Sequence, residues 1–309
     1  MIVTQRCGSA PRTAAAAASV LKTKRRKDSG LAYLIPVGVF FIVITLYPVV
    51  YAFYNSLFKW NWGTNREFVG LANYSVLFQD GAMWEAWGRT LFFAVTAVVF
   101  ETAIGLVLAV FLNGLGRRSA NLTRGVLMVP LMASGIVVAS VWKIMLDPTF
   151  GVIPRTIGDI LPTDAYLGDP KWAMVLIIAI DAWWQTAFAF IVLTAGLDSL
   201  PIEPFEAATV DGASAFQKFI YVTLPSLRPW ILMVVGIRMV ETLKVFDLIF
   251  GTTGGGPGRS TETIQVLTYL TGFKGMQMSD AMTMMMIALL LLGAVGIVIS
   301  IIRRVVRHA

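Results

Sequence analysis

The chain has 309 residues, of which 57% are hydrophobic and only 14% charged, whereas about a quarter of the residues in a soluble domain are charged. This composition predicts an integral membrane protein and excludes a large soluble catalytic domain. The single cysteine, Cys7, and the single histidine, His308, exclude a disulfide framework, a metal site and a histidine-based catalytic site. We therefore expect no enzyme activity, and no metal or cofactor bound by this chain.

The N-terminal segment, residues 1–29, is rich in lysine and arginine and predicts a disordered basic tail. No charged residue occurs from Gly30 to Phe58, and this run exceeds the roughly 20 apolar residues that cross a bilayer. It is also too long for a cleaved signal peptide. The run predicts a first membrane span at about 31–54.

Five further apolar runs follow along the chain. A run at about 229–250 is interrupted by four charged residues, but it is needed to divide an otherwise very long loop. The other four runs are nearly free of charge and predict spans at about 90–113, 124–146, 172–196 and 281–302. The predicted fold class is an all-α integral membrane protein with six transmembrane helices, and its membrane domain extends over 30–305.

The distribution of basic residues predicts the orientation of these spans. Six spans place both termini on one side, and that side carries the larger share of lysine and arginine. Basic residues are enriched in cytoplasmic loops, so we expect both termini in the cytoplasm. The net charge of +7 is then explained by topology, and no nucleic-acid partner is expected.

The loop at 198–225, between the fourth and fifth spans, is expected to form two short cytoplasmic helices. Pro201 and Pro204 are suited to a first helical turn, and Gly212 allows the positive φ that ends a helix. Ser214 and Gln217 have the spacing of a capping box, which begins a second helix. The apolar side chains of these helices need a partner, or the membrane interface, to cover them.

The same loop contains Glu206-Ala207-Ala208, then Gly212, and it ends in Leu224-Pro225. This pattern resembles the cytoplasmic signature of the permease subunits of binding-protein-dependent ABC importers. Three further motifs are similar to the carbohydrate branch of that family, the maltose- and glycerol-phosphate-type permeases. They are Tyr47-Pro48, Phe246-Asp247 and the stretch from Thr253 to Pro257. The resemblance covers about 31–305.

The resemblance implies that the loop docks on a separate cytoplasmic ATPase. By that likeness the coupling residues are Glu206, Ala207, Ala208, Asp211, Gly212 and Phe216. It also implies a homologous second permease subunit, two ATPase subunits and an extracytoplasmic solute-binding protein, all at a bacterial plasma (inner) membrane. ATP and magnesium would be bound by the ATPase subunits, because no G-x-x-x-x-G-K-[ST] motif occurs in this chain.

Charged residues inside predicted spans point to a functional region, because they are costly in a bilayer. Arg238, Glu241, Lys244 and Asp247 recur every three residues along the fifth span. They form either a self-neutralising ladder of i, i+3 pairs or part of the lining of a transport path. In the second and third spans, Glu101 and Lys143 are a further candidate pair.

A substrate site is expected at similar depth in the fourth and fifth spans. Asp181, Trp184, Gln185 and Phe188 share one helix face, where carboxylate and amide oxygens can accept hydroxyl protons while rings stack on a sugar. The aromatic residues could instead face lipid. Maltose-type permeases bind sugar with the helices on either side of the signature loop, so the resemblance adds three residues of the fifth span: Arg238, Glu241 and Thr242.

The predicted function is therefore that of a permease forming half of the path for a mono- or oligosaccharide. One alternative keeps the family but changes the cargo to a sugar phosphate or a polyol such as glycerol-3-phosphate, which Arg238 and Lys244 would suit. Asp181, Glu241 and Asp247 count against a strongly anionic cargo. Two alternatives from other classes are a polytopic membrane glycosyltransferase and a secondary transporter driven by an ion gradient.

Overall fold

The computed structural model describes residues 31–63, 65–113, 117–158 and 166–308. The predicted basic tail at 1–29 lies outside these residues. The regular secondary structure of the described residues is helical apart from two strands of two residues each, which confirms the predicted all-α class. The strands, β1 (Phe58–Lys59) and β2 (Glu67–Phe68), pair antiparallel.

The chain divides into two compact units, one ending at Val49 and the other beginning at Val50. The described part of the first unit belongs to helix α2 (Leu31–Ser56), whose last residues enter the second unit. The stretch Leu34–Ser56 is long and apolar enough to cross a membrane. This agrees with the first predicted span.

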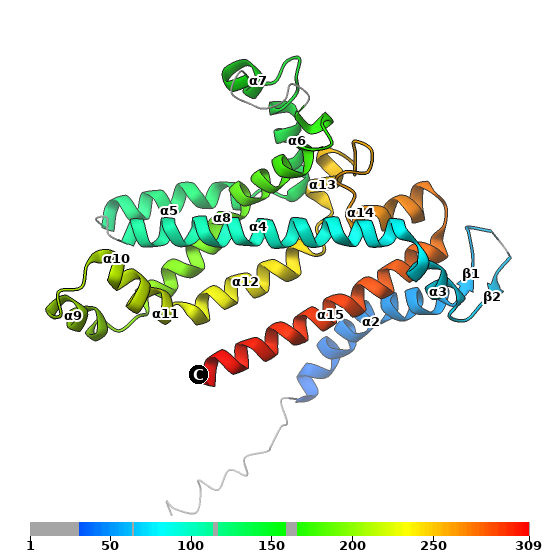
Figure 1. Cartoon of the computed structure of the whole chain (residues 1–309). Helices are drawn as coiled ribbons and strands as arrows, with labels where there is room; N and C mark the ends of the chain where they lie inside the picture. Colours follow the sequence, from blue (N-terminus) through cyan, green and yellow to red (C-terminus); the bar gives the residue numbers. More distant parts are fainter. Residues whose placement is uncertain (1–30, 64, 114–116, 159–165, 309) are drawn as a thin grey trace, which may run out of the picture. The chain divides into compact units, whose positions relative to one another are not determined.

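Three helices of the second unit are also long and apolar enough to cross a membrane: α4 (Gly81–Asn113), α8 (Ala173–Asp198) and the stretch Met278–Ile301 of α15 (Met278–His308). Helices α4 and α8 make the most extensive helix contact of the unit, and Figure 1 shows α8 crossing α4 at an angle. Two bent helix pairs would raise the number of spans from four to six. The predicted count of six remains a prediction.

The third predicted span, 124–146, is not one continuous helix. It is divided between α5 (Arg117–Leu131) and α6 (Gly135–Met145), which are bent by 96° at the break. Pro130 lies in the last turn of α5, and Ser134 is extended, with φ −72° and ψ 152°. Proline near a helix end and an extended residue before the next helix account locally for the break.

The fifth predicted span, 229–250, is interrupted as well. Helix α12 (Arg228–Thr242) ends, four residues intervene, and α13 (Asp247–Thr252) begins. The intervening Leu243, Lys244, Val245 and Phe246 include neither glycine nor proline. Because local sequence supplies no helix breaker there, the interruption depends on tertiary contacts.

The 198–225 loop forms the two predicted helices. Helix α9 (Glu203–Val210) has Pro204 in its first turn, and Gly212 follows with φ +74°. Ser214 and Gln217 form both hydrogen bonds of a capping box at the start of α10 (Ala215–Lys218). A π-helical segment, η3 (Phe219–Thr223), and α11 (Leu224–Ser226) then lead into α12.

The opposite end of the second unit carries α3 (Ala72–Gln79) and the strand pair (Figure 1). The indole nitrogen of Trp62 donates to the carbonyl of Gly272, and the amide of Trp60 donates to the hydroxyl of Ser279. These bonds join the strand-pair region to η4 (Leu270–Lys274), which follows α14 (Ile264–Tyr269), and to the start of α15. Two short elements, α7 (Val152–Ile157) and η2 (Tyr166–Gly168), lie between α6 and α8 in the chain.

The glycine-rich motif after α13 is a tight turn. Gly254, Gly255 and Gly258 all have positive φ, a conformation that glycine adopts without steric cost. Just beyond the turn, Arg259 donates two hydrogen bonds to Oε1 of Glu262, which raise the pKa of the arginine. The motif is therefore a structural turn braced by an ion pair.

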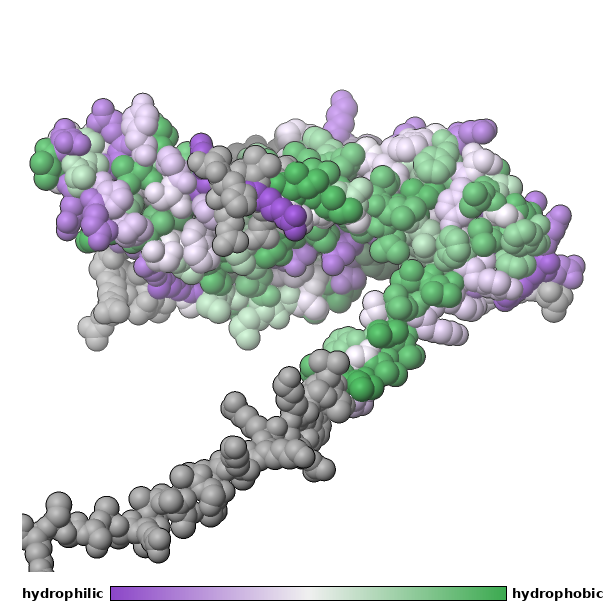
Figure 2. Space-filling view, turned by 90° about the horizontal axis from the view of Figure 1, so that it is seen from below, coloured by the Kyte–Doolittle hydropathy of each residue, from purple (hydrophilic) through white to green (hydrophobic). Residues whose placement is uncertain are grey.

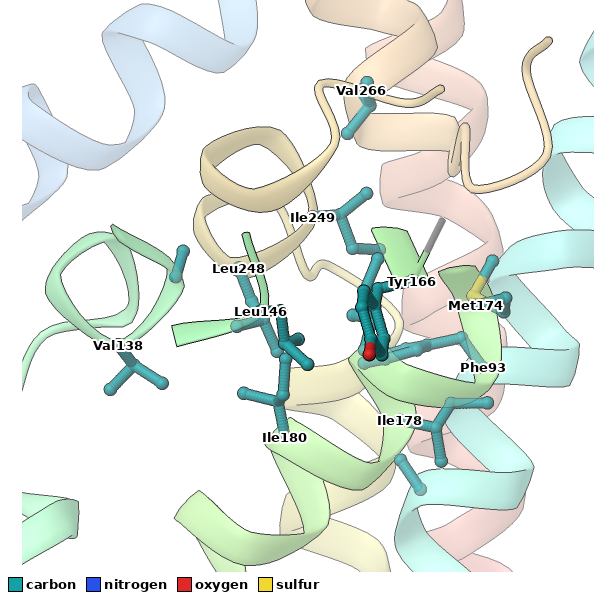
Figure 3. Close-up of a cluster of buried hydrophobic side chains, with 13 residues drawn as sticks. Phe93, Val138, Leu146, Tyr166, Met174, Ile178, Ile180, Leu248, Ile249 and Val266 are labelled. Atoms are coloured by element: carbon teal, nitrogen blue, oxygen red, sulfur yellow. The ribbon is translucent and has the colours of Figure 1, made fainter. Parts of the chain in front are cut away.

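A buried cluster of apolar side chains packs α8 against α4, α6 and α13 (Figure 3). Phe93, Ile177 and Ile249 are fully buried in it. The surface has the opposite character from that of a soluble protein, because large hydrophobic residues are exposed along the long helices. Figure 2 shows hydrophobic residues over the middle of the second unit and hydrophilic residues gathered toward its ends. A belt of this kind is typical of a membrane protein.

Candidate functional site

A cavity of about 440 Å³, lined by both polar and apolar residues, opens where α12 is interrupted, between α8 and the break that separates α5 from α6. All seven residues predicted to bind substrate line it. From α8 come Asp181, Trp184, Gln185 and Phe188, and from α12 come Arg238, Glu241 and Thr242. The structure thus brings together two sets of residues that are more than 40 positions apart in the sequence.

The α8 wall follows from helical spacing. Residues 181, 184, 185 and 188 return to one face of the helix, and that face is turned to the cavity. The neighbouring residue Trp183 does not line the cavity. Its side chain is half exposed and packs edge-on against Trp142. The indole nitrogen of Trp184 is buried without an acceptor among the described residues. It is a free donor beside the cavity.

The interruption after α12 supplies a second wall that the sequence analysis did not assign to substrate. Lys244, Val245, Phe246, Asp247 and Leu248 line the cavity in addition to the predicted residues. The side chains of Lys244 and Asp247 are exposed, and the ring of Phe246 stacks on Phe250 with centroids 5.0 Å apart. Two signals for this wall were available in the sequence: the charged ladder, in which Lys244 and Asp247 were candidates for the lining of a transport path, and the Phe246-Asp247 motif.

The break between α5 and α6 completes the cavity with Leu131 and Gly135. A β-carbon at Gly135 would lie 3.1 Å from Cβ of Asp247 and 3.2 Å from the indole of Trp184. Glycine here lets the start of α6 approach both other walls closely. No signal in the sequence analysis identified this position.

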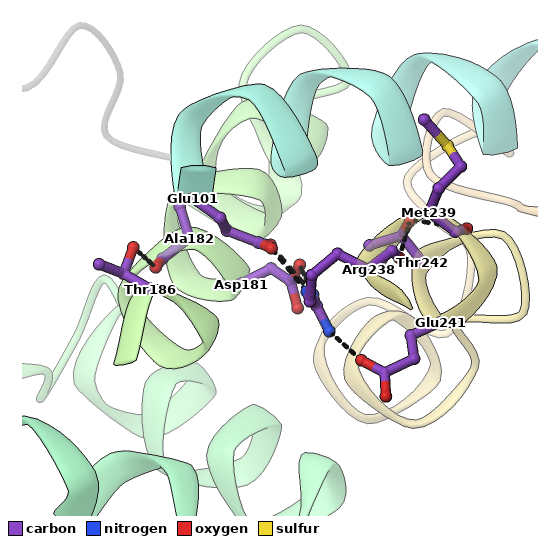
Figure 4. A network of polar contacts seen from close by, with 8 residues as sticks. All are labelled: Glu101, Asp181, Ala182, Thr186, Arg238, Met239, Glu241 and Thr242. Atoms are coloured by element: carbon purple, nitrogen blue, oxygen red, sulfur yellow. Dashed lines mark hydrogen bonds and ion pairs between the residues drawn. The ribbon is translucent and has the colours of Figure 1, made fainter. Parts of the chain in front are cut away.

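Arg238 is the centre of a buried ion network that joins three helices (Figure 4). Its Nε donates to Glu101 of α4 at 2.6 Å, and its Nη2 donates to Glu101 at 3.0 Å and to Asp181 of α8 at 3.1 Å. Its Nη1 donates to Glu241, one turn along α12, at 2.7 Å. Glu101, Asp181 and Arg238 are almost completely buried, whereas the side chain of Glu241 is 49% exposed.

The two hypotheses for the charged ladder each describe part of it. Arg238 and Glu241 form the expected i, i+3 pair, while Lys244 and Asp247 lie beyond the end of α12 on the cavity wall. The expected pairing of Glu101 with Lys143 is wrong. Both oxygens of Glu101 accept hydrogen bonds from Arg238, and Lys143 is exposed on α6. Nothing in the sequence indicated that α4 and α12 come into contact at Glu101 and Arg238.

The coupling residues proposed for the 198–225 loop lie on its surface. Glu206, Ala207, Asp211 and Gly212 are exposed, as is Phe216 at 72%, and Ala208 is half-buried. Nζ of Lys218 donates to the hydroxyl of Thr209 at 2.9 Å, which ties α10 to α9. The loop therefore presents an ordered, partly apolar surface that no described residue covers.

The described residues offer no cluster of three or more histidine, cysteine, aspartate or glutamate side chains that could hold a metal ion. The cavity instead combines carboxylates, an amide, cations and aromatic rings. Such a set can accept and donate hydrogen bonds to several hydroxyl groups while a ring packs on an apolar face. Its geometry suits recognition of a polyhydroxylated molecule.

A family model for the inner membrane component of binding-protein-dependent transport systems matches residues 101–309. The chain belongs to this family. The family is one of transport proteins, so the expectation that the chain is a permease of this family, made from the 198–225 loop, is confirmed.

Relatives extend this match over most of the chain. The probable ABC transporter permease protein y4oQ of Sinorhizobium fredii is 34% identical over 262 residues, covering 84% of each chain. The trehalose/maltose transport system permease protein MalF of Thermococcus litoralis is 32% identical over 248 residues, covering 79% of this chain and 83% of that protein. The multiple sugar-binding transport system permease protein MsmF of Streptococcus mutans is 31% identical over 269 residues, covering 87% and 92%.

Among solved structures, the fold of this permease is similar to that of a bacterial ABC transporter involved in the import of the acidic polysaccharide alginate. The TM-score is 0.77 at 23% identity, over 89% of this chain and 94% of the other. A likeness at this identity supports the fold alone.

Proposed function

We propose that this chain is the membrane permease subunit of an ATP-driven importer and forms half of the translocation path for a mono- or oligosaccharide. The observation that carries the proposal is the cavity at which α8 and α12 meet, where residues suited to a sugar converge. Relatives named as trehalose, maltose and multiple-sugar permeases support the same cargo class.

In this proposal each wall of the cavity has its own task. Trp184 and Phe188 pack on the C–H face of a sugar ring, and Gln185, Thr242 and the exposed carboxylate of Glu241 bond to its hydroxyl groups. Trp184 also has a free indole N–H. The described residues do not fully enclose the cavity, as expected if a homologous second permease subunit supplies the other half of the site.

Coupling to ATP hydrolysis is assigned to the 198–225 loop. Its exposed surface, including Glu206, Gly212 and Phe216, would dock on one of two separate ATPase subunits that bind ATP and magnesium. A solute-binding protein would deliver the sugar at the opposite end of the permease. The orientation that fits these partners has both termini in the cytoplasm of a bacterial cell, with the chain in its inner membrane.

The alternative cargoes and classes are separated by one reconstitution. Proteoliposomes containing this permease, its companion permease and the ATPase are loaded with ATP and given labelled sugar with or without the binding protein. We expect uptake of a neutral sugar that requires both ATP and the binding protein. Uptake driven by a proton gradient without ATP would instead support a secondary transporter, and transfer of the sugar to lipid would support a glycosyltransferase. Preferred uptake of a sugar phosphate would change the cargo but keep the family.

A further inference from the structure

The guanidinium group of Arg238 is occupied by carboxylates of the protein itself. It makes four hydrogen bonds: one from Nε and one from Nη2 to Glu101, one from Nη2 to Asp181, and one from Nη1 to Glu241. An arginine has five N–H groups. One N–H group therefore remains, and a two-pronged grip on a ligand carboxylate or phosphate, which needs a pair of them, is not available.

Glu101 is the part of this arrangement that lies outside the cavity. It is fully buried on α4, whereas the residues that line the cavity come from α8, from α12 and the residues that follow it, and from the α5–α6 break. It holds Nε and Nη2 from behind, so that Nη1 is left to bond Glu241 at the cavity wall. The position of the arginine relative to the cavity thus depends on Glu101, a residue that does not line the cavity.

The formal charges around the cavity also disfavour an anionic ligand. Two cations, Arg238 and Lys244, and three carboxylates, Asp181, Glu241 and Asp247, line it. Glu101 adds a fourth carboxylate directly behind Arg238. The surplus of negative charge repels an anionic ligand.

We propose that Glu101 is a positioning residue which, by occupying Arg238, makes the cavity select uncharged sugars over uronic acids. This inference rests on the proposed function, since it concerns the cargo of the same cavity. Without the charge of Glu101, the guanidinium group of Arg238 loses the counter-charge that holds it from behind, and it can turn toward a ligand carboxylate in the cavity. The preference of the cavity for uncharged sugars is then determined by Glu101, which lies behind the cavity wall.

The test uses the complete transporter in nanodiscs without its binding protein, so that sugar selection by that protein does not enter. Neutral di- to tetrasaccharides are titrated by saturation-transfer NMR, and the best-bound sugar is compared with its C6-oxidised uronic acid. We expect the wild type to prefer the neutral sugar. Glu101→Gln should shift the ratio of the two dissociation constants toward the uronic acid by about tenfold or more, because it removes one negative charge from behind Arg238.

Two further variants separate positioning from general damage. Glu101→Asp keeps a carboxylate behind Arg238 and should retain the neutral preference, which a change in packing alone would not predict. If Glu101→Gln fails to assemble, Glu241→Gln decides, because it frees Nη1 at the exposed wall and should shift the ratio in the same direction.

The outcomes distinguish this inference from the proposed function. If the wild type binds no saccharide, the proposed sugar site is wrong and the role of Glu101 is lost with it. If the wild type binds sugar but Glu101→Gln leaves the ratio of dissociation constants unchanged, the proposed sugar site is retained and the proposed role of Glu101 is wrong. A wild type that prefers the uronic acid also overturns the inference.

Discussion

Gly105 of α4 faces Ala189 of α8 so closely that a β-carbon built on the glycine would lie 2.7 Å from Cβ of the alanine. It would also lie 3.0 Å from the backbone nitrogen of Phe190. Small residues let membrane helices approach one another, since lipid provides no hydrophobic force between them. This contact holds together the two helices that carry Glu101 and Asp181.

We predict that Gly105→Leu weakens the packing of α4 on α8. Overpacking of this kind costs about 1–3 kcal/mol or more, so the purified complex should have a lower melting temperature and a lower yield. Gly88→Leu, on the same helix, is the matched control. A β-carbon at Gly88 would have no neighbouring atom within 4 Å. Equal yields and melting temperatures for the two variants would contradict the close approach as a stabilising feature.

The α8 wall of the cavity is tested with uncharged residues. Replacing both Trp184 and Gln185 with alanine should raise the sugar concentration for half-maximal uptake by roughly tenfold, the loss expected for one ring contact and one hydrogen bond. The assembled complex should still be present by size-exclusion chromatography. Trp183→Ala is the control, since that ring lies outside the cavity. Normal uptake by the double variant at limiting sugar would show that α8 does not contribute to the site.

The turn at Gly212 is expected to be needed for coupling. Its φ of +74° strains any β-branched side chain, although a β-carbon there has no neighbour within 4 Å in this chain. Gly212→Val should therefore insert into the membrane but lose most uptake in vesicles. Gly212→Asn, which tolerates positive φ, should retain more uptake than valine. Wild-type uptake by Gly212→Val would rule out the assigned role.

Replacing Arg238, the centre of the ion network, should lower the yield of the protein much more than replacing Glu241, its half-exposed member. Arg238→Gln leaves Glu101 and Asp181 buried without their cation, a change that typically costs about 3–5 kcal/mol. Its yield should fall sharply. Arg238→Lys should rescue little, because an ammonium group lacks the planar fork that reaches several carboxylates at once. Both are measured as membrane-inserted protein by immunoblot.

Glu241→Gln is the companion variant at the rim. Its side chain is half exposed, and Arg238 keeps both buried partners, so we expect nearly normal yield with altered sugar uptake. This separates the two hypotheses for the charged ladder. A fall in yield as large as that of Arg238→Gln would make Glu241 a structural residue.

Composition and spacing by themselves determined much of this protein. Charge-free runs predicted the apolar helices, because crossing a bilayer requires a minimum length of apolar residues. The 198–225 loop followed from local chemistry, since Ser214, Gln217 and Gly212 act within a few residues of themselves. The face shared by Asp181, Trp184, Gln185 and Phe188 followed from helical periodicity, and the cavity indeed lies along it.

Only the tertiary structure decided which charged groups meet. Glu101 and Arg238 are 137 residues apart, and no local pattern relates positions on α4 and α12. Sequence reasoning therefore offered Lys143 as a candidate partner for Glu101, whereas the packing of α12 against α4 brings Glu101 to Arg238. The interruption after Thr242 was equally hidden, because it contains no helix breaker and exists through contacts with other helices. Long-range packing thus placed the fourth carboxylate behind the cavity, and with it the electrostatic character of the site.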